Sequence, residues 1–247
     1  MPYNPNNPDF TLPQGDDPTI WRYIDLARLV SMLRDQSVFF PRADTVGDTH
    51  EGSLSQPSVD ARAEYFRAQG QPQVDATMHM LYEKARFRTY LSCWHVSEHE
   101  SAAMWSIYSQ KGFGVVIRST VMHLINSIEL DPNDIYVGQV NYIEYETTPI
   151  PIGNVYAPYV HKRKSFEHEK ELRAVTMEHP TADGQLDLSY VGPVGMLVSV
   201  DIETLVQDLF VAPESGDWFR NVVQSTIERF GLAREVKRSS IDLGPLY

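Results

Sequence analysis

Residues 161–175 read HKRKSFEHEKELRAV, and the rest of the chain is organised around this stretch. A basic triplet leads into alternating charges, which give way to an apolar end. In a β-strand successive side chains point to opposite faces, so Glu169, Glu171 and Arg173 would share one wall of a groove. Carboxylates so close raise each other's pKa unless a cation relieves them, and Arg173 or the basic triplet can do so. Such a wall suits acid–base catalysis or stabilisation of a developing cation.

The same residues also fit the exposed start of a helix. Glu167 and Lys170 would then form an ion pair three residues apart, and Glu169 and Arg173 one four residues apart. Both interpretations are compatible with the pattern.

Composition narrows the class of protein. The chain has 247 residues, 42% of them hydrophobic and 11% aromatic, which is typical of a globular protein with a sizeable core. Its formal net charge is -12, from 33 acidic and 21 basic residues. Such a charge argues against broad electrostatic binding of nucleic acid or an anionic membrane. It still permits a local basic channel near residues 84–88 or 162–164.

Cysteine content and the N-terminal segment predict a cytoplasmic location. Cys93 is the single cysteine, so no disulfide can form within the chain, as expected in a reducing compartment. The first 18 residues have neither a basic segment nor a long apolar one, so we expect no signal peptide. The sequence contains no run of about 18 apolar residues, so we expect no membrane span.

Apolar periodicity and turn residues divide the chain into alternating elements. Residues 1–18 are rich in Pro, Asn and Asp and predict an extended or disordered arm, and we expect residues 1–16 to contribute little to the core. Beyond it we expect strands at 20–24, 37–40, 89–94, 114–119, 135–145, 195–200, 209–212 and 233–238. We expect helices from Leu26 with Asp25 as the N-cap, at 60–68 and 74–88, from a cap at Ser97, and at 121–127, 202–207 and 217–230.

One string has the spacing of a metal site. His95, Glu98 and His99 form an H-x-x-E-H pattern, in which two histidines of one helix can bind zinc while the glutamate acts as a base. A cap at Ser97 would leave His95 in the loop before the helix. A polar loop and helix start is therefore the alternative, since short motifs often match by chance.

Two arginines occupy unusual positions. Arg22 lies between Trp21 and Tyr23 in an apolar strand, and Arg42 follows another apolar strand. A charge in such a strand must reach solvent, a partner or a ligand. An exposed strand face would satisfy Arg22 equally well.

Several of these segments together resemble a known family. They are Trp21-Arg22-Tyr23, residues 40–52, Ser92-Cys93-Trp94-His95 with residues 100–105, and residues 162–173. The chain is similar in them to a large family of bacterial proteins catalogued as a domain of unknown function. That resemblance covers most of the chain from about residue 20 and implies homology without a settled activity.

A deeper resemblance is to ADP-ribosyltransferases. These enzymes open with a strand carrying Arg or His, a helix and a second short strand, and residues 21–40 look like that unit. They place a Ser- or Tyr-bearing strand in mid-chain, and residues 91–93 are similar to it. They close the site with a glutamate, often in E-x-E at a strand start, and residues 169–171 look like that motif.

The resemblance implies that NAD is the substrate, with Glu171 catalytic and Glu169 beside it. Arg22 would hold the NAD phosphates or ribose, and Ser92 would support the nicotinamide ribose. Cleavage of the nicotinamide–ribose bond passes through an oxocarbenium-like state, which a carboxylate near the ribose stabilises. The residues assigned in this way to nucleotide binding are Arg22, Tyr23, Arg42, Ser92 and His95.

We therefore expect one α+β domain over residues 19–247. It would have a mixed, split β-sheet flanked by helices, an ADP-ribosyltransferase-like core and a C-terminal βαβαβ-like segment. Arg22, Arg42, Ser92 and Glu171 should converge on one cleft, since an unpaired polar group in an apolar strand is unfavourable.

The predicted function is ADP-ribosyl transfer from NAD or NAD hydrolysis, without a metal. The substrate is a small nucleotide, the acceptor a protein or nucleic acid, and analogy suggests a bacterial toxin or phage-defence effector. Two alternatives remain: a metal-dependent hydrolase that uses His95 and His99, and a non-enzymatic module that binds a ligand or nucleic acid. The oligomeric state is left open.

Overall fold

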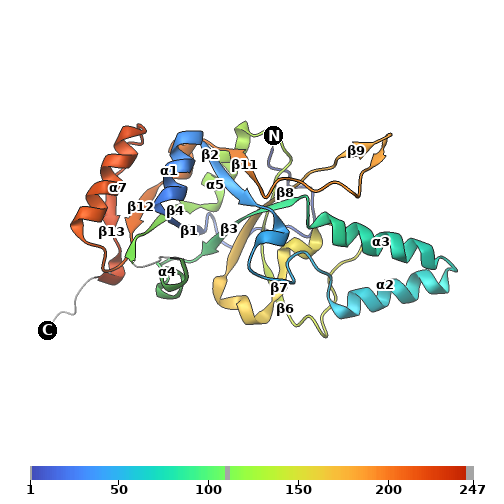
Figure 1. Cartoon of the computed structure of the whole chain (residues 1–247). Coiled ribbons are helices and arrows are strands. Elements are labelled where there is room, and N and C mark those ends of the chain that lie inside the picture. The colour runs from blue at the N-terminus through green and yellow to red at the C-terminus, as the bar shows by residue number, and fades with distance from the viewer. Residues whose placement is uncertain (1, 109–111, 243–247) are drawn as a thin grey trace.

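A computed structural model describes residues 2–108 and 112–242 of the chain (Figure 1). Its main sheet has seven strands in the order β13-β12-β4-β1-β3-β8-β5. Neighbouring strands are antiparallel except β12 and β13, which are parallel, so the mixed sheet flanked by helices is confirmed. The strands are β1 (Thr19–Asp25), β3 (Thr89–Val96), β4 (Gly114–Thr120), β5 (Tyr136–Gln139), β8 (Glu171–Met177), β12 (Asp208–Val211) and β13 (Val236–Arg238).

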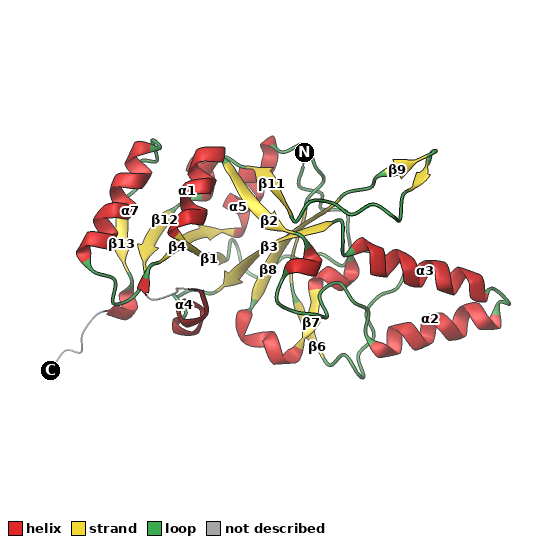
Figure 2. Cartoon of the chain, viewed as in Figure 1, coloured by secondary structure: helices red, strands yellow, loops and turns green. Residues whose placement is uncertain are grey.

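Three two-stranded sheets surround the main one. They are β2 (Ser37–Pro41) with β11 (Gly195–Ser199), β6 (Asn141–Ile143) with β7 (His161–Arg163), and β9 (Thr181–Ala182) with β10 (Gln185–Leu186). The helices are α1 (Leu26–Asp35), α2 (Gln56–Ala68), α3 (Pro72–Ala85), α4 (Ala102–Tyr108), α5 (Val121–Ser127), α6 (Ile202–Leu205) and α7 (Asp217–Arg229). Figure 2 shows α7 and β13 at one end of the molecule and the α2–α3 hairpin projecting from the other. Within the described ranges, no helix is both long and apolar enough to cross a bilayer.

The main sheet is covered on both faces. On one face α1, α5, α6 and α7 join a large apolar cluster with alternate strand residues such as Ile20, Trp94 and Leu172. On the other face α4 packs on Trp21 and Tyr23, while smaller clusters follow along β3 and β8. Because strand residues alternate between these faces, the position of each side chain relative to the core follows from its register.

The sheet opens between its two central strands. β1 pairs with β4 along all seven of its residues, but with β3 only through Ile20–Val96 and Trp21–His95. Beyond Trp21 the two strands separate, and no further residues pair across this gap. The split lies at the middle of the sheet, where side chains from both strands meet.

α1 begins where the sequence predicts. The Asp25 side chain accepts a hydrogen bond from the Arg28 amide at 2.7 Å, so it caps the helix. Leu29, Met32 and Leu33 are buried on the inner face at helical spacing. The cap therefore holds Arg28 at the split edge of the sheet.

Two expected elements are wrong in position. The helix predicted from Ser97 begins instead at Ala102, where Ser101 Oγ accepts from the Met104 amide at 3.3 Å. Ser97 accepts from the amide of His99 in a local turn. Either serine offers the same capping hydroxyl, and the continuation of β3 to Val96 decides between them.

The C-terminal βαβαβ-like segment is also corrected. Only β12, α7 and β13 form a parallel crossover unit, because β11 leaves the main sheet and pairs antiparallel with β2. In β11, Leu197 is 52% exposed whereas Val198 is fully buried. Such alternation is typical of an antiparallel strand with one face in solvent, and parallel strands are usually buried on both faces.

The N-terminal segment is extended, but it packs closely on the sheet. Tyr3 bridges to Ile135, and the Gln139 amide donates to Thr11 O at 2.8 Å. Phe10 is buried, with its ring centroid 5.4 Å from that of Tyr136. The expectation that residues 1–16 contribute little to the core is therefore wrong for those described, 2–16. The overall composition of the segment is that of a disordered arm, but the single buried residue Phe10 anchors it.

Replacement of Phe10 should destabilise the protein measurably. Phe10→Ala removes a buried ring, and we expect a loss of about 3 kcal/mol in the free energy of unfolding. Urea unfolding of the variant measures this loss, with Leu12→Ala as the control because Leu12 is 39% exposed. Equal effects of the two substitutions would show that the segment is not anchored.

Candidate functional site

β8 starts two residues later than the charge pattern predicts. Residues Lys164–Glu169 form a 3₁₀ helix, and Lys170 follows in the left-handed conformation with φ of 42°. This turn ends the helical segment and starts the strand at Glu171, so the expectation that Glu169 lies in the strand is wrong. Glu171 and Arg173 still share one face, as alternation requires.

A chain of buried ion pairs centres on these two residues. Arg173 donates to Glu171 at 2.6 Å and binds Glu51 through two parallel bonds of 2.7 and 2.9 Å. Lys162 donates to the other oxygen of Glu171 at 2.7 Å and also to Glu169. We call these five residues the Glu51–Glu169 network.

The Glu51–Glu169 network shifts the pKa values of Glu171 and Glu169 in opposite directions. Burial works against the charge of Glu171, but Arg173 and Lys162 outweigh burial and hold the pKa of Glu171 well below its usual range. Burial, together with the neighbouring Glu171 carboxylate, raises the pKa of Glu169 to about 7. One carboxylate therefore stays ionised while the next can exchange a proton near neutral pH.

A cavity of about 540 Å³ opens at the split in the sheet and reaches the network. Its walls come from β1, β3, the start of β8, residues 41–51 and the end of α4. Glu169, Glu171 and Arg173 line one side of the cavity, and Arg22 and Trp94 line another. The split thus joins both faces of the sheet in one site.

Arg22 presents a positive charge to this cavity. Its guanidinium donates to Ser92 Oγ and, at 3.2 Å, to Phe39 O, and it lies 5.5 Å from the centre of the Trp94 ring. None of the ion pairs within residues 2–108 and 112–242 includes Arg22. Burial lowers the pKa of Arg22 to about 10, so an anion in the cavity would be favourable.

Two residues assigned to nucleotide binding do not line the cavity. Ser92 is buried on the face opposite Glu171, where it accepts hydrogen bonds from Arg22 and from Trp94 Nε1. Arg42 turns away and binds Asp44, at 2.5 Å, and Gly192 O. The expected convergence of Arg22, Arg42, Ser92 and Glu171 is therefore corrected: Ser92 supports Arg22, and Arg42 fixes a loop.

Tyr23 and His95 do line the cavity, beside Glu169. The Nδ1–H of His95 donates to Glu169 O at 2.6 Å, which leaves Nε2 as the acceptor nitrogen. Burial lowers the pKa of His95, so the ring is neutral at pH 7. The Tyr23 hydroxyl accepts from the Ser101 amide at 2.8 Å, and burial raises the pKa of Tyr23 to about 12.

Sequence analysis missed three residues of this site. Arg28 lines the cavity at the first turn of α1, and Tyr108 lines it from α4. Glu51, in a polar loop, is the buried partner of Arg173. The predicted cap at Asp25 places Arg28 in the first turn of α1 and could have indicated it. No local pattern indicates that Glu51 pairs with Arg173, 122 residues away.

The structure separates His95 from His99, the two histidines that the metal alternative requires as ligands. His95 lies in β3 and is buried, whereas His99 is exposed in the following loop. Among the described residues, no three His, Cys, Asp or Glu side chains are grouped to hold a metal ion. The H-x-x-E-H string therefore does not form the helical site that its spacing suggests.

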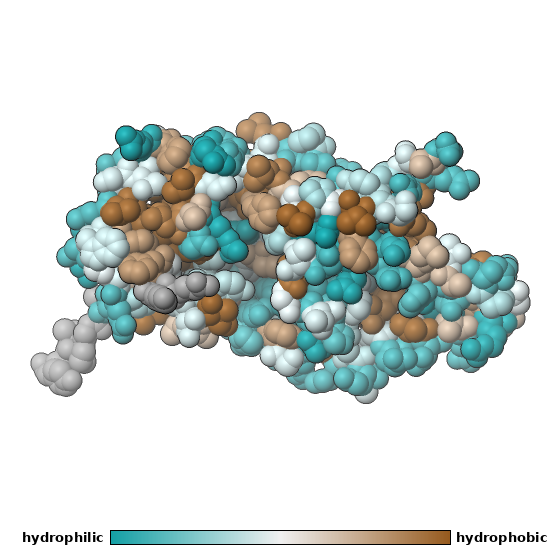
Figure 3. Space-filling model, in the orientation of Figure 1, coloured by the Kyte–Doolittle hydropathy of each residue, from teal (hydrophilic) through white to brown (hydrophobic). Residues whose placement is uncertain are grey.

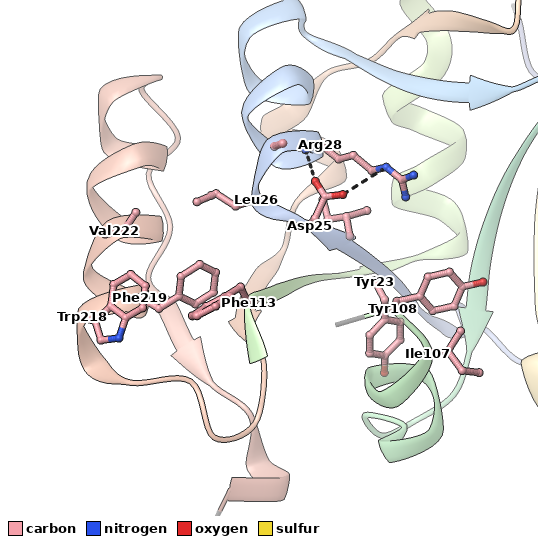
Figure 4. Close-up of a pocket in the computed structure, with 12 residues that line it drawn as sticks. Tyr23, Asp25, Leu26, Arg28, Ile107, Tyr108, Phe113, Trp218, Phe219 and Val222 are labelled. Carbon is pink, nitrogen blue, oxygen red and sulfur yellow. Dashed lines mark hydrogen bonds and ion pairs between the residues drawn. The ribbon is translucent and has the colours of Figure 1, made fainter. Parts of the chain in front are cut away.

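A second cavity, of about 630 Å³, adjoins the first (Figure 4). Trp218, Phe219 and Phe113 form one wall, and Tyr23 and Tyr108 face them across the opening, as Figure 4 shows. The start of α1, with Asp25, Leu26 and Arg28, also lines this cavity and lies above both walls in the view of Figure 4. Figure 3 shows the apolar surface gathered between α7 and α1, where this aromatic cavity opens.

Comparison with known proteins yields one structural similarity. No protein-family model matches the chain, and no curated protein does, so the resemblance to a family of unknown function gains no support. The chain is similar to the solved structure of Thermus sp. 2.9 DarT in complex with NAD+. The match covers 95% of this chain and 100% of that chain, with 9% identity and a TM-score of 0.43. A likeness this weak carries no argument about function.

The raised pKa of Glu169 predicts a pH-dependent contribution to stability. The folded protein keeps a proton that the unfolded chain releases between pH 4.5 and about 7. The free energy of unfolding should therefore fall as pH rises through this window, by at most about 1.4 kcal/mol per unit. Urea unfolding at several pH values should show this fall in the wild type and a flatter profile in Glu169→Gln. Identical slopes would contradict the assignment.

Proposed function

We propose that the chain binds NAD in the split-sheet cavity and cleaves the bond between nicotinamide and ribose, by ADP-ribosyl transfer or NAD hydrolysis. One observation carries the proposal: an ionised carboxylate, Glu171, and an arginine with no acidic partner among the described residues, Arg22, face the same cavity. NAD is the first ligand to test, because it combines a diphosphate, which suits an arginine, with a ribose that develops a positive charge, which suits a carboxylate.

Two of the three arginines that line the cavity, Arg22 and Arg28, suit a diphosphate. Arg22 has no carboxylate partner in the described ranges, and Arg28 makes only a 3.7 Å contact with Asp25. Guanidinium groups bind phosphate oxygens through paired N–H donors. We place the NAD diphosphate between these groups.

The ionised Glu171 suits the reacting ribose. When the C1′–nitrogen bond breaks, its electron pair leaves with the nicotinamide, and the ribose carries a developing positive charge. A carboxylate held in place by Arg173 and Lys162 stabilises that charge without reorganisation. Water or an acceptor group of a protein or nucleic acid then bonds to C1′, and Glu169 can take its proton.

The aromatic cavity is the place for the adenosine half. Trp218 is 59% exposed at its wall and offers a flat surface for a base. Stacking on an aromatic side chain contributes about 1–3 kcal/mol, so Trp218→Ala should weaken NAD binding about tenfold. Calorimetry should show no change for nicotinamide mononucleotide, which lacks the adenosine. Equal losses for both ligands would contradict this placement.

A second function, ligand binding without turnover, is favoured by one observation. Both carboxylate oxygens of Glu171 already accept hydrogen bonds from cations, and its side chain is only 7% exposed. A glutamate so occupied could serve to hold the cavity in shape. NAD would then bind and leave unchanged.

Nicotinamide release separates these functions. The assay incubates the purified protein with NAD, alone and with cell extract as a source of acceptors, and calorimetry measures binding in parallel. Transfer or hydrolysis predicts nicotinamide release that Glu171→Gln abolishes. Binding without release supports the second function, and neither binding nor release overturns both.

A further inference from the structure

The pairing of β2 with β11 turns backbone groups of β11 away from the rest of the protein. The Arg42 amide donates to Val194 O at 2.9 Å, so these two residues form a hydrogen-bonded pair. In an antiparallel ladder such pairs alternate with non-hydrogen-bonded ones, so the even-numbered residues of β11 bond to β2. Gly195, Leu197 and Ser199 therefore direct their N–H and C=O groups away from β2.

These outward groups form an open strand edge. The Ser199 amide donates to Asp131 Oδ2 at 2.7 Å, which closes that end of the edge. Within residues 2–108 and 112–242, no hydrogen bond from outside the β2–β11 ladder reaches the backbone of Gly195 or Leu197. Leu197 is exposed and Gly195 is half-buried, so the edge is open at the surface over these two residues.

The same edge carries an exposed apolar pair. Leu197 lies opposite Phe39 in a non-hydrogen-bonded pair, in which side chains approach closely, and Phe39 is 45% exposed. A Cβ at Gly195 would collide with the Phe39 ring, so this ring lies over the glycine. Val194, at the start of β11, is also exposed. The edge thus offers backbone hydrogen bonds and an apolar surface together.

Both edges of the main sheet are protected in ways that the β11 edge is not. β13 carries Lys237 and Arg238, and such charges discourage pairing with a further strand. β5 is covered by the N-terminal segment, since the Gln139 amide donates to Thr11 O. Residues 194–199 read VGMLVS, without a charge or a proline. An exposed apolar edge without these devices indicates a surface that pairs with another strand.

We propose that the β11 edge binds an extended, uncharged segment of a partner protein by strand addition. The backbone of the segment would pair with Gly195 and Leu197, and its alternate apolar side chains would pack on Leu197 and Phe39. A second copy of this chain fits less well, because stable association buries at least about 1,200 Å² and the open edge is short, whereas a transient partner binds through less. A net charge of -12 on each copy also opposes self-association.

The bound segment would lie beside the split-sheet cavity. On the other edge of β2, Phe39 O accepts from Arg22 at 3.2 Å, and Pro41 of the same strand lines the cavity. Neighbouring strands lie about 4.8 Å apart, so the segment is held about 10 Å from β2. If the cavity transfers ADP-ribose, the docked protein is its acceptor; this step rests on the proposed function, whereas binding of the segment does not.

Fluorescence anisotropy with a labelled peptide tests the docking without NAD. The probe is the blocked heptapeptide KTVTVTK, whose threonine and valine favour strands and whose terminal lysines keep it soluble. The wild type should bind it saturably. Leu197→Pro removes an outward N–H and no bond to β2, and should weaken binding at least tenfold. Leu197→Val keeps the amide and should bind like the wild type, as should Tyr65→Lys in the projecting α2–α3 hairpin (Figure 2).

Hydrogen exchange followed by NMR locates the bound peptide. At saturation the amides of Gly195 and Leu197 should exchange at least tenfold more slowly than in the free protein. The amides of Met196 and Val198 already bond to β2 and should not change. This alternation is specific to strand addition, because a peptide lying on the face of the ribbon does not distinguish odd from even positions.

The proposal fails if the peptide does not bind at millimolar concentration, if Leu197→Pro binds it like the wild type, or if exchange slows equally at odd and even positions. A dimer in sedimentation equilibrium that Leu197→Lys dissociates would assign the edge to a second copy instead. If Leu197→Pro does not fold, Leu197→Lys decides, because a charge on the edge opposes strand addition and leaves the backbone intact.

Discussion

Arg22→Met should weaken NAD binding by about 30-fold or more. The substitution keeps an apolar side chain of similar length against Trp94 and removes the paired donors that we assign to the diphosphate. Hydrogen bonds to charged groups contribute about 1.5–3 kcal/mol, which corresponds to this loss. Titration calorimetry with NAD measures it directly.

The stability of the Arg22→Met variant distinguishes a binding role of Arg22 from a structural role. Arg22 has no acidic partner in the described part of the chain, and burial disfavours its charge, so the free energy of unfolding should not fall. Arg34→Met, at an exposed arginine of α1, is the matched control and should bind NAD like the wild type. Undiminished binding by Arg22→Met would remove Arg22 from the site. A large loss of stability would show that Arg22 serves the fold.

Glu171→Gln should lower both turnover and stability. Loss of a preorganised charge at the reacting centre typically lowers turnover by about 100- to 1,000-fold. The amide also leaves Arg173 and Lys162 without a common anion in a buried site, which costs about 3–5 kcal/mol. This differs from a substitution on an exposed catalytic residue, which would leave the fold intact.

The two effects can be measured separately. Nicotinamide release is assayed well below the melting temperature of the variant, and urea unfolding gives its stability. Glu167→Gln, at an exposed glutamate of the 3₁₀ helix that precedes β8, should change neither. A loss of stability with full turnover would make Glu171 a structural residue and favour another carboxylate, Glu169, as the catalytic one.

Local signals in the sequence predicted most elements near their true positions. The cap at Asp25 and the apolar spacing after it predicted α1, and the predicted range 121–127 coincides with α5. Each of these elements is specified by residues within one or two turns of one another. The Phe10 anchor was missed because a single aromatic residue among prolines has no periodicity.

Which side chains enter the site depends on the register between β3 and β8, and this register cannot be read from the sequence. In the pairing of β3 with β8, Cys93 lies opposite Arg173 and Ser92 lies opposite Ala174. A shift of one residue would have placed Ser92 on the face of Glu171. The predicted roles of Glu171 and Arg22 remain proposals, and that of Ser92 changed because this register turns it beneath Arg22.

A crystal structure of the wild-type protein soaked with NAD tests the central claim most directly. We predict the diphosphate between Arg22 and Arg28, with an oxygen about 3 Å from the Arg22 guanidinium, and the nicotinamide ribose against Glu171. NAD bound elsewhere on the protein, or an empty cavity at millimolar NAD, would contradict the proposed site.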